Sequence, residues 1–324
     1  MSLHPSVAAV RLGVRRVLRD LPAGGTALVA CSGGADSLAL LAAAVFEAQK
    51  LALRVVGVTV DHQLQEGSGD HAASVTGQMR ALGVDESVTA TVSVSAVGVG
   101  PEAAAREARY DVLAELASRF DADAVLLGHT LVDQAETVLL GLTRWSGGRS
   151  LAGMRREFDL FRRPLLDVTR ADTETACLAE GIEFWTDPHN GDEQFTRVRV
   201  RTKVLPLLED ELGPGVARTL ARTADQLRAD TVYLDAVADL ALAETRSEDT
   251  LPVERLVELP EAIRRRVLRL AAVAAGSTPG ELFHEHVVAL DRLVTHWHGQ
   301  KGVDLPGHVR ATRVEGVIEF GSWR

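Results

Sequence analysis

A glycine turn in the first tenth of the chain carries residues that could bind phosphate. Residues 32–37 read SGGADS. Two glycines permit a tight turn whose backbone N–H groups, with those of a following helix, converge on an anion, and the serine hydroxyls add donors. Asp36 would repel a phosphate unless a divalent cation or the helix start offset its charge, so the turn also predicts Mg²⁺. The alternative is a plain turn in which Asp36 caps the helix.

Two acids and a histidine form a second candidate group. Asp133 and Glu136 are three residues apart in a helical pattern, which puts both carboxylates on one face, and His129 precedes them at the end of a predicted strand. Paired acids suit either Mg²⁺ or the ammonium groups of lysine. A solvated acidic face with a structural histidine is the alternative.

The elements that position these residues alternate between strand and helix. A buried strand is predicted at 26–31, directly before the turn, and a helix at 37–46, directly after it. Further strands are expected at 54–60, 87–94, 124–127 and 182–185, and further helices at 71–83, 101–120, 131–142 and 170–181. This alternation predicts an α/β fold with a doubly wound, mostly parallel sheet.

The pattern changes near residue 214, where Gly-Pro-Gly at 213–215 interrupts a helix that begins near Arg197. Amphipathic runs at 214–245, 260–275 and 282–296 predict a helical half, and the alternation in 303–320 predicts a small terminal hairpin. We therefore expect a catalytic domain at 1–213 and a smaller helical domain at 214–324.

Composition excludes several classes of protein. With 46% hydrophobic and 25% charged residues, the 324-residue chain falls in the globular range. No apolar run approaches the roughly 20 residues of a membrane span, and the start of the chain does not look like a secretion signal, so a cytoplasmic protein is expected. The only cysteines, Cys31 and Cys177, are too far apart for a CxxC pair. A net charge of −10 argues against nonspecific coating of nucleic acid.

Several segments in register resemble a known family. The turn resembles that of the PP-loop ATP pyrophosphatases, which have a Rossmann-like fold and adenylate a carbonyl oxygen while releasing pyrophosphate. Within that superfamily, GHTLVDQAET at 128–137, RPLL at 163–166 and RVRVRTKVLP at 197–206 look like the tRNA(Ile)-lysidine synthetase family. Members of that family use ATP and free L-lysine to convert the wobble cytidine of an isoleucine tRNA with a CAU anticodon into lysidine. Thr130 and Val132 depart from the family pattern, which has His and Asp there.

The resemblance implies a role for each candidate residue. Asp133 and Glu136 would hold lysine or metal, and His129 and Arg109 would contact the adenylated cytosine or phosphates. With Asp36 these form the expected catalytic set, and Asp36 and Asp133 are the expected metal ligands. The expected ATP-binding residues are Ser32, Gly33, Gly34, Ala35, Asp36, Ser37, Asp61 and His62.

Local positive charge indicates an RNA partner despite the acidic total. Residues 142–170 contain seven arginines and three acids, and 196–203 contain four basic residues and no acid. Alternate arginines in the second segment could follow successive phosphates; the alternative is a set of structural ion pairs. The expected tRNA-binding residues are Arg144, Arg149, Arg197, Arg199 and Arg201. No membrane partner is expected, and a homodimer is left open.

The resemblance implies a ligase that forms a C–N bond between lysine and the tRNA, and two other functions are alternatives to it. A tRNA thiolase on the same fold would activate a similar carbonyl, but it needs sulfur delivery, which two distant cysteines do not supply. A noncatalytic ATP- or RNA-binding module would hold ATP without turnover. Chemistry that depends on both lysine and tRNA separates the three.

Overall fold

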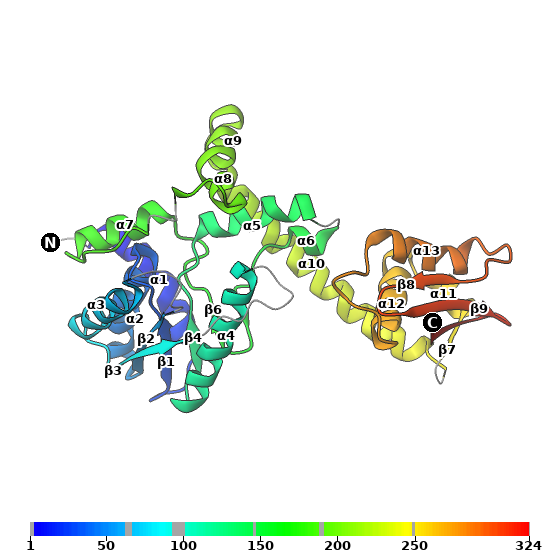
Figure 1. Cartoon of the computed structure of the whole chain (residues 1–324), viewed down its shortest axis with the longest axis horizontal. Helices are drawn as coiled ribbons and strands as arrows, with labels where there is room; N and C mark the ends of the chain where they lie inside the picture. Colours follow the sequence, from blue (N-terminus) through cyan, green and yellow to red (C-terminus); the bar gives the residue numbers. More distant parts are fainter. Residues whose placement is uncertain are drawn as a thin grey trace. The chain divides into compact units, whose positions relative to one another are not determined.

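The computed structural model describes residues 3–61, 67–92, 101–144, 147–187, 191–247 and 250–323, without the side chains of 101–105 and 144. The chain divides into two compact units (Figure 1). The first comprises Met1–Leu140 and Gly153–Thr223, and the second comprises Gly141–Ala152 and Ala224–Arg324. None of the helices in these described stretches has the length and apolar character of a membrane span.

The first unit is built on a mostly parallel sheet with the strand order β3-β2-β1-β4-β6-β5. Its strands are β1 (Thr26–Ala30), β2 (Arg54–Asp61), β3 (Glu86–Thr91), β4 (Ala124–Leu126), β5 (Glu157–Phe158) and β6 (Phe161–Arg162). Every pairing is parallel except that of β5 with β6 at one edge. Strands β2 and β3 follow β1 on one side of it, and the next strand in the chain, β4, lies on the other side of β1. The direction of strand order therefore reverses beside β1. This is where open α/β sheets bind ligands.

Helices cover both faces of this sheet. Leu38 and Leu41 of α2 (Ala35–Leu51) pack with Val29 on one face, where α1 (Pro5–Leu18), α3 (Ser68–Ala81) and α7 (Arg170–Ala179) also contribute to the core. Leu113 of α4 (Pro101–Arg119) packs with Leu28 on the other face. Leu28 and Val29 are consecutive and fully buried on opposite faces, as expected of a strand in a parallel sheet. The predicted doubly wound α/β fold is confirmed.

The remaining helices of the first unit follow β4 and α7. They are α5 (Leu131–Arg144), whose last turn belongs to the second unit, α8 (Thr196–Arg199), a π-helical segment (Val200–Val204) and α9 (Leu205–Leu212). The strand predicted at 182–185 is absent: residues 182–187 carry no regular structure. Ile182 and Phe184 still pack on the core, and the N–H of Trp185 donates to Gly33 O at 2.9 Å, so the alternation reflects an extended segment anchored on the turn.

The second unit contains more strand than the sequence predicts. Its helices are α6 (Gly148–Leu151), α11 (Val253–Glu258), α12 (Glu261–Ala274), α13 (His284–Thr295) and most of α10 (Val216–Thr245). The expected hairpin, β9 (Val309–Val314) with β10 (Val317–Ser322), is present, but β7 (Thr250–Pro252) and β8 (Val303–Leu305) extend it to a four-stranded antiparallel sheet. Three-residue strands such as β7 and β8 are too short to show a period of two.

Candidate active site

The turn before α2 is held by its own hydrogen bonds. The Ser37 hydroxyl accepts from the Ser32 N–H at 3.1 Å and donates to Gly34 O at 2.9 Å. Gly33 has a φ of +82°, and a Cβ there would lie 2.6 Å from a methyl group of Val75, so this position needs glycine for both backbone and space. Gly34 is the N-cap of α2 and makes no side-chain cap bond. The interpretation of Asp36 as the helix cap is therefore wrong.

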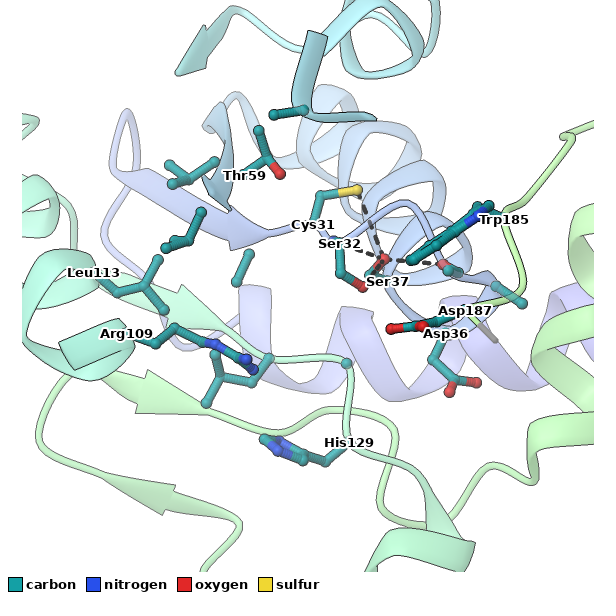
Figure 2. A pocket seen from close by; sticks show the side chains of 18 of the residues that line it. Cys31, Ser32, Asp36, Ser37, Thr59, Arg109, Leu113, His129, Trp185 and Asp187 are labelled. Carbon is teal, nitrogen blue, oxygen red and sulfur yellow. Dashed lines mark hydrogen bonds between the residues drawn. The ribbon is translucent and has the colours of Figure 1, made fainter. Parts of the chain in front are cut away.

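A pocket of about 520 Å³ opens beside this turn at the carboxyl ends of β1, β2 and β4, and we call it the loop pocket (Figure 2). It brings together most of the residues that the sequence predicts for catalysis and ATP binding. The predicted residues that line it are Ser32, Gly34, Ala35, Asp36, Ser37, Asp61, Arg109, His129, Asp133 and Arg201. The predicted residues of the first unit that are not in its lining are Gly33, Glu136, Arg197 and Arg199, and His62 lies outside the described residues.

Asp36 is a carboxyl group whose charge is poorly compensated. Burial raises the pKa of Asp36 to about 6, although a hydrogen bond from Thr173 Oγ1 and the positive charge of Arg170 act in the opposite direction. The neighbouring charge of Asp133 raises it further. A cation next to Asp36 would relieve both effects, so Asp36 and the neighbouring Asp133 fit a divalent cation, which would supply positive charge for a phosphate.

Asp133 lies at the start of α5 and is held by Thr130. Its Oδ2 accepts from the Thr130 N–H at 2.8 Å and from the Thr130 hydroxyl at 3.0 Å. Burial acts to raise the pKa of Asp133, but the Thr130 N–H and the nearby His129 and Arg197 together hold it below its usual range. Thr130 therefore supplies two hydrogen bonds that orient the Asp133 carboxylate.

His129 follows β4 and lies in the wall of the loop pocket, below Arg109 in the view of Figure 2. Burial lowers the pKa of His129 to about 3, with further lowering by Arg163 and Arg106 and an opposing effect of Asp133. The imidazole is therefore neutral at physiological pH. Its Nδ1 is 3.3 Å from Nε of Arg163, which donates to it.

Glu136 is fully buried and paired with two arginines. It accepts from Nε of Arg197 at 2.7 Å and from Nε of Arg201 at 2.6 Å. Both guanidinium groups also approach Asp133 Oδ1, at 3.8 and 3.9 Å. The two acids thus share one helix face, as their spacing predicts, and guanidinium groups fill the place in which ammonium groups were expected.

The arginines of 197–201 do not form an evenly spaced row. In a helical conformation Arg197 and Arg201 are one turn apart and meet the same acids, whereas the exposed Arg199 donates to Glu193 O at 2.7 Å and Gln194 O at 2.8 Å. The expectation that alternate positions follow successive phosphates is wrong, because that geometry needs an extended chain. The ion pairs give a competing account of Arg197 and Arg201, and their contact with tRNA stays a prediction.

A positive group lines the loop pocket. Arg106 and Arg109 of α4 and Tyr110 beside them belong to its lining. Burial lowers the pKa of Arg109, and the adjacent Arg106 lowers it further. This concentration of positive charge suits a phosphate or another anionic oxygen.

The other two predicted tRNA-binding residues belong to the second unit. Arg149 pairs with Asp235 at 2.6 Å and lines a second pocket of about 850 Å³, which also contains Arg265, Arg266 and Arg269 and which we call the arginine pocket. Arg144 ends α5, and its side chain is outside the described set.

Sequence reasoning missed two residues of α7 that act on Asp36. Arg170 lines the loop pocket, and Thr173 donates to the Asp36 carboxylate. The available signal was the capping box of Thr169 and Asp172, which starts α7 and so fixes the position of its first turn. The role of Arg163 was missed as well, since nothing in RPLL indicates its partner.

Comparison with known proteins covers almost the whole chain. Residues 12–208 match the family described as PP-loop domain, and 251–316 match the one described as TilS substrate binding domain. The tRNA(Ile)-lysidine synthase of Thermobifida fusca is 54% identical over 315 residues, covering 97% of this chain and 97% of that protein. The tRNA(Ile)-lysidine synthase of Streptomyces coelicolor is 48% identical over 348 residues, covering 98% and 99%.

A solved structure gives a more distant likeness. The U34-tRNA thiolase NcsA from Methanococcus maripaludis, with its [4Fe-4S] cluster, superimposes with a TM-score of 0.58 at 15% identity, over 68% of this chain and 79% of that one. At this identity the likeness establishes the fold alone.

Proposed function

The chain belongs to the tRNA(Ile)-lysidine synthase family, and from this premise we infer that it is an ATP-dependent ligase that forms a C–N bond. It adenylates C2–O of the wobble cytidine of an isoleucine tRNA with a CAU anticodon and joins L-lysine to C2, giving lysidine, AMP and pyrophosphate. The observation that carries this inference is the convergence of the phosphate-binding turn, His129 and Asp133 on one pocket.

The turn at 32–37 is the proposed site of the ATP phosphates. Its backbone conformation is fixed by Ser37, so its N–H groups need little reorganisation to bind an anion. Asp36 and Asp133 would hold Mg²⁺ beside those phosphates. When bound, Mg²⁺ supplies charge neutralisation for the triphosphate and for the departing pyrophosphate.

The first step needs the cytosine carbonyl in line with the α-phosphorus. Attack by C2–O on the α-phosphorus displaces pyrophosphate and leaves AMP on the base. Negative charge therefore develops on the phosphate oxygen that leaves with pyrophosphate. The guanidinium groups of Arg106 and Arg109, which line the pocket, are placed to stabilise that charge. The base must leave its stack to reach them, which costs little in a single-stranded anticodon loop.

The second step needs a cation-binding group for L-lysine. Asp133 lines the loop pocket, and Glu136 lies on the same helix face. An ammonium group of lysine can take a place beside these carboxylates that a guanidinium group now holds. The other amino group, in its uncharged form, then attacks C2; the C2–N bond forms, the C2–O bond breaks, AMP leaves, and the attacking nitrogen loses one proton to solvent. Lysine binding is therefore an exchange of partners at the acids rather than the filling of an empty site.

The second unit is the proposed holder of the tRNA body, and the arginine pocket is the part of it best suited to phosphate. Arg149 and Arg266 share the single carboxylate of Asp235, at 2.6 and 3.1 Å. Arg269 donates to the carbonyl oxygens of Leu282 and Pro279 and forms no salt bridge within 4 Å among the described residues, although Asp235 is near enough to act on its charge. Such a group attracts a polyanion. We keep 1–213 as the proposed catalytic part and 214–324 as the proposed tRNA-binding part, except that 141–152, which include Arg149, go with the second unit.

The rival activities have less support. A thiolase needs reactive thiolates or a cluster, whereas burial raises the pKa of both Cys31, which lines the loop pocket, and Cys177, that of Cys177 to about 12. Because the substrate is a tRNA, we place the enzyme in the cytoplasm; sedimentation of the purified protein will decide between monomer and homodimer.

The direct test is a complete reaction with a defined product. The protein is incubated with isoleucine tRNA (CAU), ATP, Mg²⁺ and labelled lysine, and the tRNA is digested for nucleoside analysis. We expect label in lysidine at one position and none when ATP is omitted or when the wobble cytidine is replaced by uridine. ATP-dependent sulfur incorporation, or binding of ATP and tRNA without a lysine product, would contradict the proposal.

A further inference from the structure

Arg163 is an almost fully buried cation that forms hydrogen bonds with two residues of the loop pocket lining, His129 and Tyr110. It donates through Nε to Nδ1 of His129 at 3.3 Å and through Nη2 to the Tyr110 hydroxyl at 2.9 Å, and a third bond runs to the carbonyl of Arg155. Its guanidinium carbon lies 4.8 Å from the centre of the Phe158 ring. No carboxylate of the described residues pairs with it, so its orientation depends on these contacts.

The contact between Arg163 and His129 decides which ring nitrogen carries hydrogen. A guanidinium group has five N–H donors and no acceptor, so the nitrogen that it faces must offer a lone pair. Nδ1 of His129 is therefore unprotonated. In a neutral imidazole the other nitrogen, Nε2, then carries the hydrogen.

No partner for the hydrogen on Nε2 lies among the described residues. Arg163 is the one hydrogen-bond partner that the described residues give to His129, and the ring lines the loop pocket. We propose that Arg163 is a positioning residue that holds His129 as the Nε2–H tautomer, so that the ring donates a hydrogen bond to an oxygen of the substrate in the loop pocket. The identity of that oxygen rests on the proposed function; the tautomer does not.

This arrangement gives His129 a specific chemical role. Because its only lone pair is used by Arg163, the ring cannot accept a proton from the attacking lysine and is not a general base. It is a neutral donor aimed at an oxygen that gains negative charge, which is either a phosphate oxygen of ATP or the C2 carbonyl of cytosine. Burial, which keeps the imidazole uncharged, is consistent with a donor of this kind.

Paired amide substitutions test the role of each ring nitrogen. The amide N–H of glutamine can reach the place of Nε2, whereas that of asparagine reaches only as far as Nδ1. We expect His129→Gln to keep lysidine formation within about tenfold of the parent, and His129→Asn to lose about 100-fold, as when one oxyanion donor is removed. Equal losses in the two variants would overturn the proposal.

The same variants identify the acceptor. ATP affinity is measured without tRNA, and formation of the adenylated tRNA is measured without lysine. A loss of ATP affinity in His129→Asn assigns the bond to a phosphate oxygen, and unchanged ATP affinity with slow adenylation assigns it to the cytosine carbonyl. If neither changes and only lysine transfer fails, His129 acts as the base and the proposal is wrong.

A nitrogen-15 NMR spectrum tests the tautomer without any reaction. In the full chain with labelled histidine, the His129 ring is identified by its loss in His129→Gln, and we expect a pure Nε2–H pattern. Arg163→Met should give a mixture of tautomers, Arg163→Lys should restore the pattern in part, and the neighbouring Arg162→Met should leave it unchanged. An Nδ1–H ring in the parent, or an unchanged ring in Arg163→Met, would overturn the positioning role even if lysidine is formed.

Discussion

The phosphate-binding turn and the acidic face of α5 meet in the same pocket but differ in readiness for a ligand. In the turn, the Ser37 hydroxyl satisfies the Ser32 N–H and the Gly34 carbonyl and so fixes the backbone. On α5, Glu136 is already saturated by Arg197 and Arg201. Under the proposed function, the end of the pocket that would take the nucleotide is preorganised, whereas the end that would take lysine must release one cation before it binds another.

The largest expected effect comes from Asp36→Asn, which removes the charge that would hold a cation but keeps an acceptor for Thr173. Formation of adenylated tRNA should fall by about 100-fold or more, because a charge-neutralising contact to the reacting phosphates is lost. Release of pyrophosphate at saturating Mg²⁺ measures it. Asp70→Asn, at an exposed acid in the first turn of α3, is the control and should have parent activity.

Stability should respond to Asp36→Asn in the opposite direction to activity. In Mg²⁺-free buffer, the raised pKa of Asp36 means that the parent binds a proton at this carboxyl more tightly when folded than when unfolded. Ionisation of Asp36 therefore destabilises the folded parent as pH rises from about 4 to 6. The variant should therefore be more stable than the parent at pH 7.5, by up to about 3 kcal/mol, and nearly equal to it below pH 4. A variant less stable at pH 7.5 would show that the carboxylate is compensated in the folded state.

The next effect concerns Glu136→Gln, on the acidic face of α5 but outside the lining of the loop pocket. A neutral amide cannot pair with an ammonium group, so KM for lysine should rise about tenfold or more while the ATP affinity stays within about twofold. Loss of a buried ion-pair partner should also cost about 3 kcal/mol of folding stability. Steady-state kinetics against each substrate measures the split.

Glu86→Gln is the control, since Glu86 lies in the same unit and forms an exposed ion pair with Arg54, away from the lining of the loop pocket. It should change neither KM by much. An equal loss of ATP and lysine affinity in Glu136→Gln would indicate that Glu136 helps to bind the metal ion. The proposed difference between the nucleotide end and the lysine end would then be wrong.

The smallest expected effects are on Tm and on the salt dependence of tRNA binding, and they should differ between Arg197→Ala and Arg199→Ala. Arg197→Ala leaves Glu136 with one partner and should lower Tm by several degrees, with little change in how tRNA binding depends on salt. The exposed Arg199→Ala should keep Tm and reduce the slope of log K against log salt by up to about one unit. If Arg197→Ala keeps Tm and reduces the slope, the arginines serve tRNA rather than the acids.

The turn and the strands around it could be predicted because each depends on local sequence. Gly33 needs a positive φ, and the buried strands β1 and β2 are short apolar runs bounded by turns. The same reasoning placed Asp133 and Glu136 on one face, which depends only on the helical period. These features need no knowledge of distant residues.

What failed depended on partners far away in the chain. Residues 182–185 alternate like a strand, but the strand positions beside β1 are taken by β2 and β4, and the segment binds the turn instead. Glu136 and Arg201 are 65 positions apart, and both could have faced solvent on local pattern alone. Ion pairs between distant residues leave no periodic pattern in the sequence. The pairing of Glu136 with Arg197 and Arg201 could therefore not be predicted from it.

The anchoring of residue 185 on the turn gives the first unit an optical reporter. Of the four tryptophans at 145, 185, 297 and 323, only Trp185 belongs to that unit. Its indole lies 4.2 Å from the His71 ring, and His71 Nε2 is 3.0 Å from Ser32 O, so the fluorophore is coupled to the turn through both backbone and ring. If the turn binds the nucleotide as proposed, binding should change the emission of Trp185 without any attached dye.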